Sequence, residues 1–171
     1  LLYHGVREKK GMSYKTIQSG GVSKNGKLDA PDVLSLCQIE GIDYQDEMVT
    51  YVLEAEASPH LASELEGTTI EIEKIKKNFM KLCEQYDYLI VEGAGGLQVP
   101  LIRDKYHIYD LIQDFGFPVV LVSSAKVGSS NHAVLTIESL EKLGIPWHGI
   151  IFKRVKDTEE SKIYEKANTE I

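Results

Sequence analysis

Cysteine is scarce in this sequence, and its few copies are not arranged for metal or disulfide chemistry. Only Cys37 and Cys83 occur in 171 residues, without a CxxC pair and without the histidine spacing of a zinc site. The five histidines form no ligand cluster that is visible in the sequence. We therefore expect two buried thiols in a protein of the reducing cytoplasm.

Basic residues are outnumbered, and long apolar runs are absent. The 19 Lys and Arg residues stand against 26 Asp and Glu, giving a formal net charge of −7. A broad nucleic-acid surface needs clustered cations, so this balance favours a small-molecule substrate. No run approaches the roughly 20 apolar residues that span a bilayer, and no signal-peptide pattern opens the chain. Neither nucleic acid nor a membrane is expected as a partner.

Several catalytic motifs are also missing. The sequence contains no GxSxG elbow, no HExxH and no GxGxxG, so hydrolase and dehydrogenase interpretations lose their usual support. It also contains no GxxxxGK(S/T), the phosphate-binding loop of P-loop enzymes. Residues 11–16 end in Lys-Thr but lack the preceding glycine that this motif requires.

What is present is an ordinary globular composition, 43% apolar and 26% charged, which favours one domain over residues 1–171. Helical apolar periodicity alternates with short apolar runs. This alternation predicts an α/β fold with a doubly wound, mostly parallel sheet flanked by helices. We expect strands at 12–17, 88–91, 119–122 and 147–152, a polar loop at 22–30, and helices at 1–10, 31–40, 69–86, 108–115, 132–143 and 156–171.

The two ends of the sequence favour an incomplete domain. The chain begins without Met, in what reads as the middle of a helix that stops at Gly11. The last segment is charged and ends without a closing strand. We expect truncation at both ends, with a first strand and a phosphate-binding loop of about 15 residues fitting upstream of Leu1.

Ligands of an open parallel sheet bind beyond the carboxyl ends of its strands. Three such ends carry reactive groups, at 15–19, 92–96 and 123–131. Glu92 directly follows an apolar run that is expected to be buried on both faces, and glycines behind it leave room for an anion. This is where nucleotide enzymes hold magnesium. A structural glutamate that caps a tight turn is the alternative.

Other polar residues near these strand ends have structural alternatives too. Asp32, taken alone, is more often a helix first-turn acid, and Ser19 is more often a turn residue. Lys15 is either a functional ammonium or an edge-strand charge. The segment 58–60, Ser-Pro-His, is more often a rigid loop turn than part of a pocket.

Four segments together resemble the dethiobiotin synthetase family over nearly the whole chain. They are YKTIQSG at 14–20, SPH at 58–60, VEGAGG at 91–96 with VPL at 99–101, and GSSNHA at 128–133. The resemblance implies a P-loop NTPase-like fold and a cytoplasmic, homodimeric ligase that needs ATP and Mg²⁺. Such an enzyme joins CO2 to 7,8-diaminopelargonate and closes the cyclic urea of dethiobiotin, a step of biotin biosynthesis.

The same resemblance implies a role for each matched residue. Lys15 is the implied catalytic lysine, which neutralises the carbamate and the transferring γ-phosphoryl group. Asp32 and Glu92 are the implied Mg²⁺ ligands. The implied contacts with substrate are Ser19, Asn131 and Tyr164, the last two across the homodimer interface. The implied contacts with the nucleotide are Asp32, Glu92, Gly93, Ala94 and Gly95.

The sequence departs from the family pattern at three points. Thr16 stands where proline is usual, and Lys153 with Arg154 stands where an asparagine usually helps to read adenine. The third departure is the missing P-loop, which predicts an inactive chain. Two alternatives stay open: a non-catalytic remnant that serves as a dimeric scaffold, and another P-loop ligase or a ParA-like ATPase. The strand that carries Lys15 disfavours the second of these.

Overall fold

The computed structural model describes residues 2–6, 9–24, 26–153 and 158–169. These residues form two compact units, Leu1–Leu111 and Ile112–Ile171. Both units combine parallel strands with helices, which confirms the predicted α/β class and its parallel sheet.

The first unit is built on a parallel three-stranded sheet with the order β4-β1-β5. Strand β1 is Gly11–Gln18, β4 is Val49–Val52 and β5 is Tyr88–Glu92. In this register Lys15 pairs with Val49 on one side and with Glu92 on the other. The interpretation of Lys15 as an edge-strand charge is therefore wrong, because β1 is the central strand.

Strand β5 lies at an edge of this sheet, and it is less buried than its apolar sequence predicts. Its three middle residues are half-buried, while Tyr88 and Glu92 at its ends are exposed. The expected burial on both faces is therefore wrong for these described residues. The strand nevertheless spans the predicted residues, with Glu92 as its last member.

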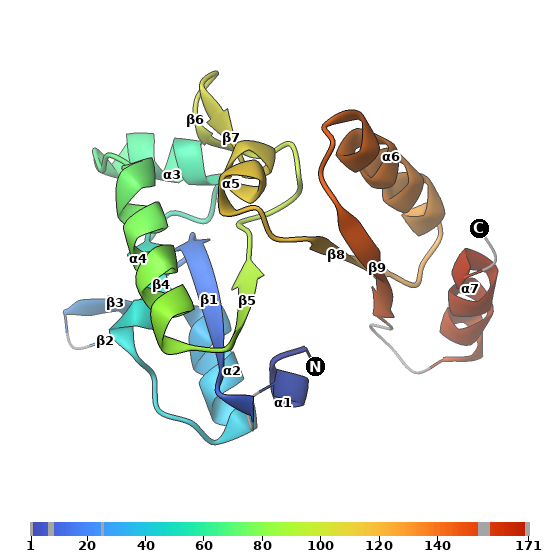
Figure 1. Cartoon of the computed structure of the whole chain (residues 1–171), viewed down its shortest axis with the longest axis horizontal. Coiled ribbons are helices and arrows are strands. Elements are labelled where there is room, and N and C mark those ends of the chain that lie inside the picture. Colours follow the sequence, from blue (N-terminus) through green and yellow to red (C-terminus); the bar gives the residue numbers. More distant parts are fainter. Residues whose placement is uncertain (1, 7–8, 25, 154–157, 170–171) are drawn as a thin grey trace. The chain divides into compact units, whose positions relative to one another are not determined.

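Helix α4 (Ile72–Gln85) supplies much of the core of the first unit. It lies along the sheet and contacts β1, β4 and β5 (Figure 1). Ile75, Phe79 and Leu82 are buried on one helical face, as the apolar spacing predicted. From the sheet side, Tyr14 and Ile17 of β1 are fully buried as well. The core thus fixes β1, the strand that carries Lys15.

The other helices of this unit are short. They are α1 (Leu2–Val6), α2 (Pro31–Glu40), α3 (Pro59–Glu66) and the start of α5 (Ile108–Phe115), which crosses the boundary between the units. Helix α1 ends before Gly11, which was expected to stop it. Gly11 instead opens β1, and a Cβ added there would lie 2.6 Å from the carbonyl oxygen of Val6. Close backbone approach is the physical reason for this glycine.

Several short elements of the first unit were not predicted. The expected polar loop at 22–30 is an antiparallel hairpin of β2 (Val22–Lys24) and β3 (Lys27–Asp29), with Gly26 at a φ of 78° in its turn. The remaining unpredicted elements are β4, α3, a 3-10 turn at Asp46–Met48, and the β6–β7 hairpin, Pro100–Ile102 with Tyr106–His107.

The second unit contains a βαβ arrangement. Strands β8 (Val119–Ser124) and β9 (Trp147–Lys153) pair in parallel, and α6 (Ser129–Lys142) connects them and packs on β8. Helix α7 (Glu159–Thr169) follows. Gly116 and Gly144 adopt φ values of 68° and 67° after α5 and α6, the left-handed conformation in which glycine commonly ends a helix.

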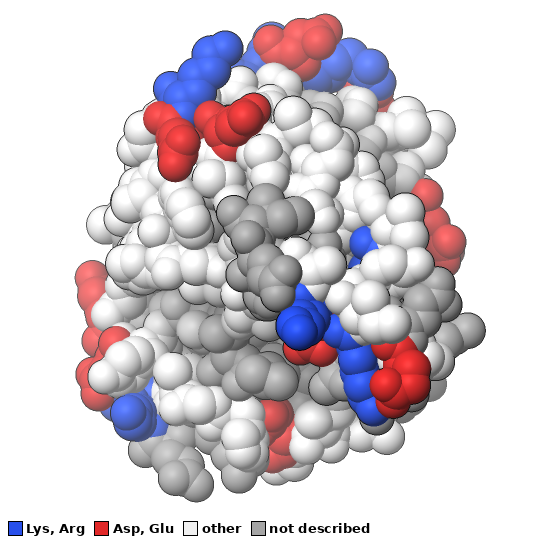
Figure 2. Space-filling view, turned by 90° about the vertical axis from the view of Figure 1, so that its right-hand side faces the viewer, with Lys and Arg blue, Asp and Glu red and all other residues white. Residues whose placement is uncertain are grey.

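Three expectations from the composition concern membrane spans, surface charge and the cysteines. No helix in the described ranges is long and apolar enough to cross a membrane. On the face drawn in Figure 2, the described basic and acidic residues are interspersed, and they form no broad basic patch there. Of the cysteines, Cys37 is buried but Cys83 is exposed on α4, so the expectation of two buried thiols is wrong for Cys83.

Candidate functional site

Lys15 is the centre of the candidate site. Its side chain is 9% exposed, and its Nζ donates hydrogen bonds to Asp32 Oδ2 and Glu92 Oε1, each at 2.7 Å. The two carboxylate oxygens therefore lie no more than twice 2.7 Å, or 5.4 Å, apart. The structure brings together the residues that the sequence suggested as a lysine and two metal-binding carboxylates.

The local sequence explains why these three side chains meet. The β1–β5 register sets Lys15 beside Glu92, the last residue of β5. On α2, Ala30 is the N-cap and Pro31 the first helical residue, so Asp32 lies in the first turn. An acid is favourable there because the helix N-terminus carries a partial positive charge. Asp32 thus fills the helix-start role and also reaches Lys15.

The electrostatics keep Lys15 positively charged. Burial disfavours its ammonium form, but the hydrogen bonds and charges of Asp32 and Glu92 outweigh burial and raise the pKa of Lys15 above its ordinary value. The two carboxylate side chains are 50% and 60% exposed, respectively. The arrangement is a buried cation whose acidic partners face outward, where an ion or ligand can reach them.

A pocket of about 350 Å³ lies beside Lys15. Its polar lining comes from Lys15, Asp32, Gln18, Ser19 and Ser58. The rest of the lining is apolar or glycine: Ile17, Ala57, Pro59, Ala94, Gly95 and Val99. Ser19, Ala94 and Gly95 were predicted as ligand contacts, and the structure places them around one cavity with Lys15.

Backbone hydrogen bonds hold two walls of this pocket together. The Gly20 and Gly21 N–H groups donate to Ala55 and Leu53 carbonyls at 3.1 and 2.8 Å. In return the Leu53 N–H donates to the Gln18 carbonyl at 2.8 Å. The turn after β1 therefore fixes the segment that leads into Ser58 and Pro59.

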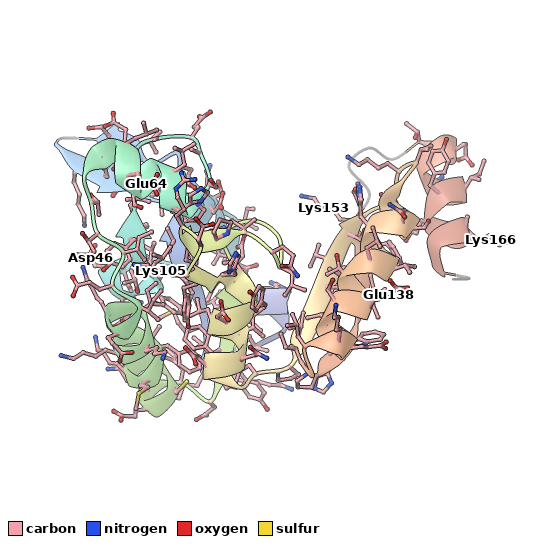
Figure 3. The ribbon with its side chains drawn as sticks, turned by 90° about the horizontal axis from the view of Figure 1, so that it is seen from above. Asp46, Glu64, Lys105, Glu138, Lys153 and Lys166 are labelled. Carbon is pink, nitrogen blue, oxygen red and sulfur yellow. The ribbon has the colours of Figure 1, made fainter. Side chains whose placement is uncertain are left out.

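The segment 58–60 begins a helix, so its interpretation as a loop turn is wrong. Ser58 is the N-cap of α3 and Pro59 its first residue. Ser-Pro is a known helix-start signal, and here it outweighs the weak apolar periodicity of the segment that follows. Glu64 of α3, labelled in Figure 3, binds the Arg103 guanidinium through both carboxylate oxygens, at 2.9 and 2.8 Å. This pair ties α3 to the segment after β6.

The glycine loop follows Glu92 directly. Gly95 has a φ of 92°, and a Cβ built on it would meet Val99 Cγ2 at 3.0 Å, so both backbone and space require glycine. At Gly93 an added Cβ would have only ordinary contacts with Ile108. Ala94 is buried. Within this loop, Gly95 is the position where the backbone conformation requires glycine, and it lines the pocket.

Gln18 is a pocket residue that the sequence analysis did not single out. It is 8% exposed, and its Nε2 donates to the Ser19 carbonyl at 2.8 Å. Its Oε1 is buried and has no hydrogen-bond partner among the described residues. The same holds for Oγ1 of the fully buried Thr16, the residue that replaces the family's proline. The available signal was position, since both belong to the segment 14–20.

The other predicted contacts lie in the second unit. Asn131 is exposed in the first turn of α6, and Tyr164 is half-buried in α7. Lys153 is exposed at the end of β9 (Figure 3), and Arg154 lies outside the described residues. Among the described residues, no three His, Cys, Asp or Glu side chains are grouped to hold a metal. Any cation at this site would therefore rely on two carboxylates.

Comparisons with known proteins point to one family. A family model described as an AAA domain matches residues 2–171. The chain is 52% identical over 156 residues to the ATP-dependent dethiobiotin synthetase of Fusobacterium nucleatum, covering 91% of the chain and 71% of that relative. The corresponding enzyme of Anoxybacillus flavithermus is 43% identical over 140 residues, covering 81% of the chain and 62% of the relative.

A third relative comes from Clostridium perfringens. Its ATP-dependent dethiobiotin synthetase is 36% identical over 161 residues, covering 92% of the chain and 69% of the relative. The chain thus spans about two thirds of the length of these proteins. With a family model over nearly its whole length and these identities, the chain belongs to the family of ATP-dependent dethiobiotin synthetases.

Proposed function

We propose that this chain carries the substrate pocket of a dethiobiotin synthetase. In the proposed reaction, 7,8-diaminopelargonate and CO2 are closed to a cyclic urea with ATP and Mg²⁺. The observation that carries the proposal is the buried Lys15 ammonium at the wall of a 350 Å³ pocket, 2.7 Å from two carboxylates. The names of the relatives supply the reaction class.

Lys15 would stabilise negative charge at two steps. An amine of the substrate attacks CO2 and loses a proton, which leaves a carbamate anion. The carbamate oxygen then takes the γ-phosphoryl group of ATP, and the second amine attacks the carbonyl carbon of this mixed anhydride and expels phosphate. A preorganised ammonium beside the pocket stabilises the anionic oxygens without reorganising solvent.

Asp32 and Glu92 fit a magnesium ion in chemistry and spacing. Mg²⁺ prefers hard oxygen ligands and is usually bound by one or two carboxylates, with water and phosphate oxygens completing its shell. Two carboxylate oxygens no more than 5.4 Å apart, from twice 2.7 Å, are close enough for one ion to bind them directly or through its own water molecules. When bound, the ion would neutralise charge on the phosphates. Backbone groups of Gly93, Ala94 and Gly95 would face the nucleotide.

The rest of the substrate contacts follow the resemblance. The Ser19 hydroxyl lines the pocket and would bind the substrate directly. Asn131 and Tyr164 would receive the distal carboxylate across a homodimer of this cytoplasmic enzyme. Light scattering of the purified chain tests the dimer, and a monomer at all concentrations would contradict this part of the proposal.

The 171 residues by themselves should lack activity. Their sequence contains no GxxxxGK(S/T), so they do not provide the ring of backbone N–H donors and the lysine that hold a triphosphate. Lys15 cannot replace this loop, because two of its three ammonium donors already bind Asp32 and Glu92 and the remaining one cannot supply a ring of donors. We therefore propose weak ATP binding, or none, and no dethiobiotin formation.

Calorimetry and a product assay test both parts. The chain is titrated with 7,8-diaminopelargonate, with and without bicarbonate, and separately with Mg-ATP. Dethiobiotin is then sought by mass spectrometry, with the Fusobacterium nucleatum enzyme run in parallel as an active reference. We expect the diamine to bind and no product to form. Failure of the diamine to bind would remove the pocket assignment, whereas product formation or micromolar ATP binding would refute the inactivity.

A further inference from the structure

Gln18 has one hydrogen-bonding group that no other described residue binds. Its side chain lines the pocket, and the bond from Nε2 to the Ser19 carbonyl, at 2.8 Å, fixes which end of the amide is the donor. The other end, Oε1, is therefore an acceptor. It is buried and unpaired among the described residues.

An unpaired buried acceptor is unfavourable and unusual in a folded protein. Leaving such a group without a partner costs its desolvation, so buried polar atoms nearly always find a donor. Gln18 lines the pocket, and the last torsion of a glutamine side chain is soft, so its amide can reorient toward a bound ligand. The missing partner is a donor, and the pocket is the place from which it can come.

Two residues of the pocket, Lys15 and Gln18, suit different chemical groups of a ligand. Lys15 offers only donors, which suit an anionic oxygen such as that of a carbamate. Asp32 accepts a hydrogen bond from Lys15, and its carboxylate is partly occupied by that ion pair. Gln18 offers a neutral acceptor, which suits an N–H group and does not attract a carboxylate.

We propose that Gln18 Oε1 accepts a hydrogen bond from one amino group of 7,8-diaminopelargonate, and so selects the diamine over molecules that lack this amine. The inference rests on the proposed function, since it names a contact within that substrate pocket. It makes Gln18 a specificity-determining residue. Stabilising the anionic carbamate remains the proposed role of Lys15.

The experiment compares variants and ligands together. Gln18→Met removes both polar ends at similar volume, and Gln18→Glu keeps an acceptor in the same place. Gln38→Met, the same change on the exposed face of α2, is the matched control. Calorimetry then measures the affinity of each protein for 7,8-diaminopelargonate, 7-aminononanoate and 8-aminononanoate. The melting temperature of each variant reports whether it folds.

We expect Gln18→Met to weaken diamine binding about 5- to 20-fold, the scale of one lost hydrogen bond to an amine. It should also weaken one monoamine and leave the other unchanged, because only one of them contains the contacted amine. Gln18→Glu should retain most of the diamine affinity, and Gln38→Met should match the unmodified chain.

Other results overturn the inference. Unchanged diamine binding by Gln18→Met, or equal losses for both monoamines, would show that Gln18 makes no contact with a particular amine. A loss with Gln18→Glu as large as with Gln18→Met would also contradict an acceptor role. If the unmodified chain binds no diamine, the proposed function fails first, and this inference fails with it.

Discussion

Lys15 and Glu92 occupy opposed positions in the parallel register of β1 and β5, and their ammonium and carboxylate lie 2.7 Å apart. Asp32 reaches the same ammonium from α2 at the same distance. One cation is therefore shared by two acids that belong to different elements. A second cation that binds these acids must displace Lys15 or bind the carboxylate oxygens that Lys15 does not contact.

Removing the ammonium should make the carboxylates better ligands for a divalent cation. In Lys15→Met, Asp32 and Glu92 would lie within 5.4 Å, twice 2.7 Å, without a neutralising charge. We expect Mg²⁺ to raise the melting temperature of this variant more than that of the unmodified chain, because the ion binds the folded state more tightly. Thermal melts over a magnesium series measure this difference.

The control for that measurement is Lys15→Met combined with Glu92→Gln, which removes one of the two acids. Its melting temperature should respond to Mg²⁺ less than that of Lys15→Met. Equal responses of all three proteins would show that the ion does not bind at this pair.

Tyr14 should make the protein sensitive to alkaline pH. Burial raises the pKa of Tyr14 to about 12, despite the hydrogen bond of its hydroxyl with Thr50. The unfolded chain ionises tyrosine near pH 10. The stabilisation that Tyr14 provides is thus fully present below pH 10 and is lost as the pH rises toward 12.

Tyr14→Phe tests this dependence. At pH 8 the variant should be about 1–2 kcal/mol less stable, because the hydroxyl bonds to Thr50 and to the Ile75 carbonyl are gone. By pH 11 the gap should narrow, since phenylalanine does not ionise. Urea unfolding at both pH values measures it, with Tyr88→Phe on an exposed side chain as the control. A gap that stays constant with pH would contradict the prediction.

Replacement by valine should affect the stability of the protein differently at Thr16, which is buried, and at Thr50, which is half-buried. The Thr16 hydroxyl has no partner among the described residues, so Thr16→Val should be neutral or stabilising by up to about 1 kcal/mol. The Thr50 hydroxyl is bonded to Tyr14 and Asn78, so Thr50→Val should destabilise by about 1–2 kcal/mol. Denaturant midpoints distinguish them, and a loss at Thr16 as large as at Thr50 would reveal a partner for Thr16.

Gly21 should tolerate no side chain. A Cβ there would lie 2.6 Å from Val52 Cγ1 and 3.2 Å from the Leu53 carbonyl oxygen, and the valine is stiff because it is β-branched. We expect Gly21→Ala to cost about 1–3 kcal/mol and to weaken diamine binding, since Gly21 holds the pocket wall. Chemical denaturation and calorimetry measure both effects.

Gly96→Ala is the matched control for stability, because a Cβ at Gly96 meets nothing within 4 Å. Should the two alanine variants prove equally stable, the close packing around Gly21 would be wrong.

The sequence predicted best what depends on local pattern. Helix α5 has the predicted bounds, Ile108–Phe115, because its apolar spacing and the glycine after it act over neighbouring residues. Strand β4 was missed, since four residues of a short strand are difficult to distinguish from a loop. The central place of Lys15 was not predictable either, because strand order depends on pairing between segments far apart in the chain.

The sequence predicted the charged residues of the candidate site but not its buried neutral residue, Gln18. Asp32 and Glu92 were identified as carboxylates near a strand end, and the structure shows that both bind Lys15. Gln18 was missed because nearly all of β1 is buried, including its polar residues, and a polar residue at a strand end gives no signal of burial in the sequence. Its unused acceptor becomes visible only when the groups around it are known.

The two cysteines differ in exposure, so the rates at which they react with a thiol reagent can report local opening of the fold. Cys83 is exposed, so a maleimide dye should label it rapidly in the folded protein. Cys37 is buried, its sulfur lies 3.9 Å from Met48 Sδ, and burial raises the pKa of its thiol. Slow labelling of Cys37 would therefore time the excursions in which α2 leaves the sheet, and a bound ligand that contacts Asp32 on the same helix should make those excursions rarer.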